Sequence, residues 1–111
     1  MSGLAALVWS PFPDPASARR CVDRLLEEGL VACANILPPM QSLYVWEGER
    51  GQAEEVGVLF KTNGDLLELA VARIDELHPY ETPAVIGWHA DRTNPAAGAW
   101  LGALGPGAGP A

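Results

Sequence analysis

The 111-residue sequence has little of the chemistry from which most catalytic and redox sites are built. It holds only two cysteines, Cys21 and Cys33, and two histidines, His78 and His89. There is no CxxC or HExxH signature, no glycine-rich phosphate loop and no Ser/His/Asp set. Two cysteines do not make a disulfide framework, so both thiols are expected to be reduced. The sequence therefore predicts a protein that is not an enzyme.

Positive charge and long apolar runs are also scarce. The chain has seven basic and fourteen acidic residues, which gives a net charge of −7. An acidic surface repels phosphate, so nucleic acids and anionic membranes are poor partners, whereas cations are favoured. No run approaches the length of a membrane span, and the first residues lack the basic region of a signal peptide. We therefore expect a cytoplasmic protein with no membrane partner and no nucleic-acid partner.

What the sequence does contain is a regular series of strand and helix signals, enough for one domain over residues 1–104. Asp14 and Pro15 are typical of a helix start, and Gly29 of a helix end. The order β-α-β-β-α-β is the ferredoxin-like pattern, an α+β fold with two helices on one face of an antiparallel sheet. The expected elements are strand 4–9, helix 15–28, a strand 30–37 that resumes at 41–46 after Pro38 and Pro39, a turn at 47–51, strand 54–61, a helix opened by 62–65 and stopped at His78, strand 84–89, a short helix from Asn94 to about Leu104, and a disordered Gly/Pro/Ala tail 105–111.

The predicted strands 4–9, 54–61 and 84–89 include successive apolar residues. Strands with one solvated face usually alternate apolar and polar residues, so the face away from the helices is expected to be covered as well. The chain has no further element long enough to cover it. A second copy of the chain is the simplest cover, which predicts an oligomer without setting its number.

Four segments in order resemble the CutA, or divalent-cation tolerance, family. They are residues 30–38 (LVACANILP), 42–48 (SLYVWEG), Glu55 with Lys61-Thr62, and 78–83 (HPYETP). The resemblance implies a cytoplasmic homotrimer with polar and aromatic groups lining clefts between subunits, and a role in tolerance of divalent cations, with copper the metal most often linked to it. Ser10 and Ala84 stand where some members have a cysteine and where the family usually has a glutamate. Their loss removes two potential metal ligands, so any copper(II) binding is expected to be weak.

The candidate site residues each have a functional and a structural interpretation. His78 is the candidate metal ligand, because neutral imidazole suits copper or zinc, although a histidine at a helix end can simply interact with the helix dipole. Cys33, in an apolar strand, is more often a core residue than a ligand. The remaining candidates could converge on a small anionic or mixed-charge ligand, as in a sensor resembling the PII signal proteins, or could pack in the trimer interface: Tyr44, Trp46, Glu47, Lys61, Tyr80 and Glu81.

Overall fold

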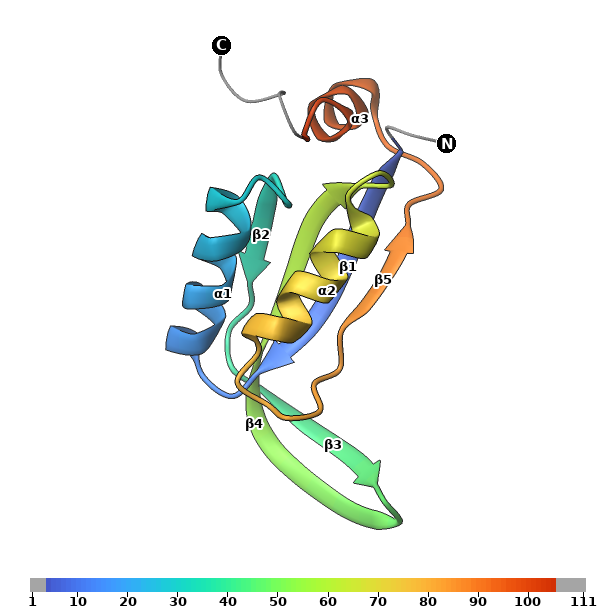
Figure 1. The fold of residues 1–111 in the computed structure, drawn as a ribbon. Helices are drawn as coiled ribbons and strands as arrows, with labels where there is room; N and C mark the ends of the chain where they lie inside the picture. Colours follow the sequence, from blue (N-terminus) through green and yellow to red (C-terminus); the bar gives the residue numbers. More distant parts are fainter. Residues whose placement is uncertain (1–3, 106–111) are drawn as a thin grey trace.

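Five strands and three helices follow one another through residues 4–105, the part of the chain that the computed structural model describes (Figure 1). All strand pairs are antiparallel, and α1 and α2 pack on one face of the sheet, so the predicted α+β arrangement is confirmed. The predicted tail, apart from Gly105, lies outside the described residues. The elements are β1 (Ala5–Phe12), α1 (Pro15–Glu27), β2 (Cys33–Ile36), β3 (Met40–Trp46), β4 (Glu49–Asn63), α2 (Leu67–Leu77), β5 (Ile86–His89) and α3 (Pro95–Gly102).

Strand β4 is the longest strand and pairs with three others. The strand order is β2-β4-β1-β5, and the outer part of β4, residues 49–55, pairs with β3. This β3–β4 hairpin projects beyond the helices (Figure 1). Its turn consists of Glu47 and Gly48 alone, with φ of 49° and 80°, and positive φ at both central residues suits a two-residue hairpin. The predicted turn 47–51 was too long and the predicted strand 54–61 too short.

Prolines mark one agreement with the predicted strands and one difference from them. Pro38 and Pro39 separate β2 from β3, as expected, and both strands pair with β4. The first strand, however, extends beyond the predicted residues 4–9, because β1 continues to Phe12 with Pro11 opposite Gly57. The pairing with β5 stops at Trp9, so Pro11 lies at an edge where no ladder bond to β5 is lost.

Helix α1 has the two ends that the sequence predicts. The Asp14 carboxylate accepts a hydrogen bond from the Ser17 backbone N–H at 2.8 Å, and this bond is the main cause of a lowered Asp14 pKa. At the other end Gly29 has φ of 71°, and the Leu30 N–H donates to the Leu25 carbonyl across it. The buried stripe of α1 then packs against the sheet, and it includes Cys21, whose thiol pKa is raised to about 11 by burial. Cys21 is therefore a residue of the hydrophobic core.

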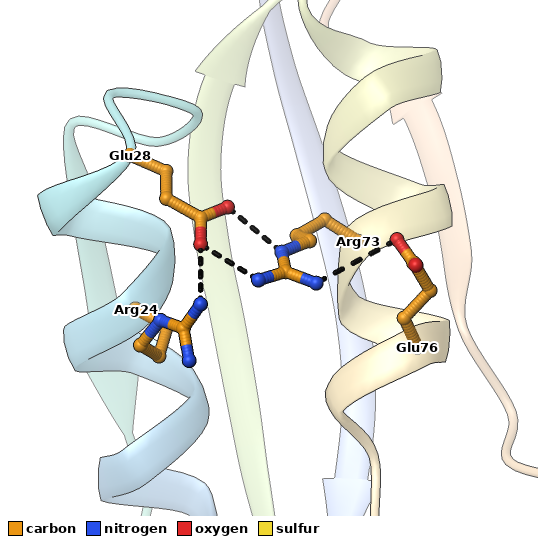
Figure 2. A network of polar contacts seen from close by, with 4 residues as sticks. All are labelled: Arg24, Glu28, Arg73 and Glu76. Atoms are coloured by element: carbon orange, nitrogen blue, oxygen red, sulfur yellow. Dashed lines mark hydrogen bonds and ion pairs between the residues drawn. The ribbon is translucent and has the colours of Figure 1, made fainter.

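An ion-pair network joins α1 to α2 on their outer surface (Figure 2). Arg73 donates from Nε and Nη2 to the two carboxylate oxygens of Glu28, each at 2.8 Å. Arg24 adds a third bond to Glu28 at 3.0 Å. The hydrogen bonds from Arg73, with the smaller contribution of Arg24, lower the pKa of Glu28 to about 2. This network holds the end of α1 against the middle of α2.

Asn63 joins the last helix to the end of β4. Its Nδ2 donates to the carbonyls of Leu101 and Leu104, at 2.8 and 2.9 Å. Its Oδ1 accepts from the N–H groups of Asp65 and Leu66, just before α2. One buried side chain, 1% exposed, therefore fixes both the end of α3 and the entry to α2.

Candidate functional site

An open groove of about 950 Å³ lies between the β3–β4 hairpin and the segment 80–84 that leads from α2 towards β5. One wall comes from the hairpin and the other from this segment, which Figure 1 shows passing the base of the hairpin. The lining residues are Pro11, Ser42, Tyr44, Val45, Trp46, Glu47, Ala53, Glu55, Tyr80, Glu81, Thr82, Pro83 and Ala84.

The hairpin wall follows from strand alternation. Ser42, Tyr44 and Trp46 are every second residue of β3, so they share one face. Gly51 lies opposite Tyr44, and a Cβ placed on Gly51 would be 2.6 Å from a ring carbon of Tyr44. The absence of a side chain at Gly51 therefore lets the Tyr44 ring lie against the strand.

A hydrogen bond joins the two walls. The Tyr80 hydroxyl donates to a carboxylate oxygen of Glu55 at 2.7 Å, linking residues 25 positions apart. Burial, and secondarily the Glu55 carboxylate, raise the pKa of Tyr80 well above its ordinary value. The hydroxyl therefore stays protonated and remains a donor to Glu55.

His78 lies behind this contact and is only 7% exposed. Its Nδ1 accepts a hydrogen bond from the Tyr80 N–H at 3.2 Å, so the neutral ring carries its proton on Nε2, which donates to the Pro11 carbonyl at 2.8 Å. The ring stacks on Phe12 with centroids 4.2 Å apart. Burial is the main cause of a lowered His78 pKa, which keeps the ring neutral near pH 7.

These contacts bear on the predicted metal site. A metal at Nδ1 of His78 would have to replace the Tyr80 N–H, and one at Nε2 would have to replace the Pro11 carbonyl. Within residues 4–105 no group of three or more His, Cys, Asp and Glu side chains could hold a metal ion. The residues present do not fit a dedicated copper site, and metal binding by His78 stays a prediction.

Ser10 and Ala84, the two positions where the sequence departs from the CutA-like pattern, lie together. The buried Ser10 hydroxyl donates to the Ala84 carbonyl at 2.8 Å. Ala84 thus uses its carbonyl to hold the groove segment against β1.

The structure separates Cys33 and Lys61 from the other candidates. They pair across β2 and β4, and strand alternation places both on the sheet face opposite the helices. Cys33 is half-buried there and does not belong to the buried core cluster beneath the helices. His78 does not line the groove. The remaining five predicted site residues do: Tyr44, Trp46, Glu47, Tyr80 and Glu81.

Glu55 is the groove residue that the candidate set lacked. The sequence marked it only as part of a family-like segment. The two-residue turn at Glu47–Gly48 sets a register that pairs Glu55 with Met40, and alternation then places it on the face of Tyr44. With the correct turn length, counting residue pairs back from the turn would have placed Glu55 on the same face as Tyr44 and added it to the predicted site.

The family model of the CutA1 divalent ion tolerance protein matches residues 6–103. The chain belongs to this family. It is 44% identical over 95 residues to the divalent-cation tolerance protein CutA of Pyrococcus horikoshii, covering 86% of this chain and 92% of that one. The CutA1 family is not an enzyme family, in agreement with the prediction.

Solved CutA1 structures have the same fold. The Ehrlichia chaffeensis CutA1 structure matches with a TM-score of 0.83 at 36% identity, over 88% of this chain and 92% of that one. The Thermus thermophilus CutA1 structure also gives 0.83, at 32% identity, over 88% and 95%. An Archaeoglobus fulgidus CutA, described as periplasmic, gives 0.82 at 28% identity, over 88% and 95%. No helix within residues 4–105 of the present chain is long and apolar enough to span a membrane.

Proposed function

We propose that this CutA1 family chain acts as a cytoplasmic homotrimer in the tolerance of divalent cations. The observation that supports the assembly is that the sheet face opposite α1 and α2, hereafter the open face, carries apolar side chains. Trp9 and Leu59 pair across β1 and β4 on this face, and Trp9 also pairs with Ile86 of β5. Ile86 is 58% exposed in the single chain, and Trp88 on the same strand is also exposed. The apolar side chains of the open face are Leu7, Trp9, Leu59, Ile86 and Trp88.

A second copy of the chain is the simplest cover for this face. Both long helices lie on the other side of the sheet, and α3 lies at one end of it (Figure 1). Within the described residues no further element remains to cover the open face. A contiguous apolar patch of this kind is typical of a protein–protein interface. The number three comes from the resemblance to the family.

Any copper(II) binding should be weak, because His78 uses both ring nitrogens in hydrogen bonds and Ser10 and Ala84 supply no ligand of the thiolate or carboxylate type.

Light scattering of the purified full chain tests the assembly. The wild type should give about three times 11.8 kDa. Ile86→Glu places a charge on the open face and should lower the mass towards that of one subunit. Leu69→Glu on α2 is the matched control, since Leu69 is 57% exposed but lies on a helix, and it should leave the mass unchanged. A wild-type mass of 11.8 kDa would refute the proposal.

The second candidate is a sensor of a small molecule resembling the PII signal proteins. The observation that favours it is the groove, whose volume and mixture of aromatic and polar walls suit a small ligand. The two candidates differ in what binds: a metal-tolerance role predicts no specific organic ligand, whereas a sensor requires one.

A further inference from the structure

We propose that Asn63–Gly64 is a deamidation site that α3 protects, and that its modification releases α3 irreversibly. In such a pair the backbone nitrogen of the second residue readily attacks the side-chain carbonyl carbon of the asparagine, because glycine has no Cβ to hinder the approach. The pair lies at the end of β4, between the entry to α2 and the end of α3. This modification needs neither an assembled trimer nor a ligand.

The sequence distinguishes this asparagine from the others in the chain. Asn35 precedes Ile36, Asn94 precedes Pro95, and only Asn63 precedes a glycine. A β-branched residue hinders the attack, and proline has no N–H. Asn35 and Asn94 are exposed, whereas Asn63 is only 1% exposed. The asparagine with the most reactive neighbour is therefore the one that the fold buries.

The reaction needs water as its only co-reactant. The Gly64 nitrogen forms a bond to Cγ of Asn63, the Cγ–Nδ2 bond breaks, and Nδ2 leaves as ammonia with the proton of the Gly64 N–H. Water then opens the cyclic imide at either of its carbonyls, which gives aspartate or isoaspartate at position 63. Overall, water is consumed, ammonia is released, and no group is oxidised or reduced.

In the folded chain both reacting groups are held in hydrogen bonds. The Gly64 N–H donates to the Leu4 carbonyl at 2.7 Å, which holds the proton that the attack must remove. The leaving Nδ2 donates to the carbonyls of Leu101 and Leu104, at 2.8 and 2.9 Å. Turning the amide so that Gly64 can attack Cγ would break both of these bonds where water does not reach to replace them. The reaction therefore requires that α3 first moves away.

Helix α3 is suited to open locally. Among its eight residues, all of which the structure describes, only Leu101 is buried, whereas α1 buries five residues. Asn94, at the start of α3, makes no side-chain capping bond. Elements with few buried residues open at a lower free energy than the whole protein. Opening of α3 can therefore expose Asn63 while the rest of the fold persists.

Neither product can hold α3 as the amide does. Both replace the amide donor by an oxygen, so the ionised product cannot donate to Leu101 and Leu104. Isoaspartate also routes the main chain through the side-chain carbon, which lengthens the backbone where Asn63 pairs with Ala5. Deamidation thus converts a transient opening of α3 into a permanent one.

Peptide mapping by mass spectrometry tests the site on the full chain, incubated in mildly alkaline buffer with and without guanidinium chloride. Asn63 should be modified at least about thirtyfold faster in the denaturant, because no opening step is then needed. Asn35 and Asn94 should change slowly in both samples. Equal rates at Asn63 in the two samples, or no modification of Asn63 in the denaturant, would overturn the proposal.

Matched variants test the role of α3. Leu101→Val removes part of its buried anchor and should raise the rate at Asn63 in the folded protein at least about threefold, and Leu101→Ala should raise it further. Ile74→Val makes a similar deletion in the core of α2 and should change the rate less than about twofold, since α3 stays in place. Circular dichroism checks that each variant is folded, and the two valine variants suffice for the comparison. Equal rates in them would show that α3 does not protect the site.

Gly64→Ala tests the chemistry. Within the described residues Gly64 is not one of the glycines with positive φ, so alanine fits its backbone. The added Cβ should slow modification of the unfolded chain at least about tenfold, and an unchanged rate would refute attack by this nitrogen.

Hydrogen exchange tests the consequence for α3. The deamidated chain carries one more negative charge and can be separated by ion exchange. Its α3 amides should exchange at least about tenfold faster than those of the unmodified protein, with α1 unchanged as the internal control. Equal exchange in α3 would show that the modification does not release the helix.

Discussion

The substitution Asn63→Asp tests whether one buried amide holds the two ends of the fold together. Asn and Asp have nearly the same shape, so the change preserves packing and alters only the hydrogen-bonding groups. The carboxylate keeps an acceptor for the N–H groups of Asp65 and Leu66. It loses the Nδ2 donor, so a second oxygen now faces the carbonyls of Leu101 and Leu104.

The magnitude follows from counting the altered bonds. Two donated hydrogen bonds are lost, each with a net contribution of about 0.5–1.5 kcal/mol. Burying a charged oxygen against two carbonyl oxygens adds about 1–3 kcal/mol, because no donor compensates its lost hydration. We therefore expect the free energy of unfolding to fall by about 3 kcal/mol at pH 7, the largest local effect being the release of α3.

The pH dependence has a definite sign. Burial raises the pKa of the introduced carboxyl above its unfolded value. An acidic group whose pKa is higher in the folded than in the unfolded protein lowers the free energy of unfolding once the pH exceeds the unfolded pKa. The difference in unfolding free energy between Asn63→Asp and the wild type should therefore be smaller near pH 4 than at pH 7. Once protonated, the carboxyl can donate one bond to a carbonyl of α3.

Urea denaturation followed by circular dichroism would measure the effect. All variants should be compared at one protein concentration, since association of subunits contributes to the apparent stability. Asn94→Asp is the matched control, because Asn94 is exposed at the start of α3 and its side chain makes no capping bond. It should change the unfolding free energy by less than about 0.5 kcal/mol, as Asn and Asp are equivalent at such positions. An equally small change in Asn63→Asp would refute the reasoning.

Two further predictions concern ionisable groups. Arg73 and Arg24 lower the pKa of Glu28 to about 2, so the contribution of this carboxylate to stability should be present above the ordinary glutamate pKa of 4.5 and lost as the pH falls towards 2. Denaturation at several pH values should therefore show the wild type and Glu28→Gln converging in acid, and a constant difference between them would contradict the network. Calorimetry with copper(II) should show weak binding, and a nanomolar dissociation constant would show that ligands have been missed. Equal binding by the wild type and His78→Ala would exclude His78 as a ligand.

The site was predicted in part because strand alternation is a local property. Tyr44 and Trp46 are two positions apart in one strand, which places both side chains on one face, and both line the groove. Cys33 and Lys61 were grouped with them from family-like segments alone, and they lie on a different surface because their alternation places them on the open face. That a residue belongs to a family-like segment therefore did not indicate on which surface of the protein it lies.

Sequence alone determined the α+β order, the start of α1 at Asp14–Pro15, its end at Gly29, and the break between β2 and β3 at Pro38–Pro39. These features depend on residues a few positions apart, through caps, proline geometry and helical or strand periodicity. The tertiary structure alone decided the extent of β4 and the contact of Tyr80 with Glu55. It also decided the two bonds of His78, one of which reaches Pro11, 67 positions away. Such contacts depend on strand register and on the path of the chain between distant elements, which the local pattern does not specify.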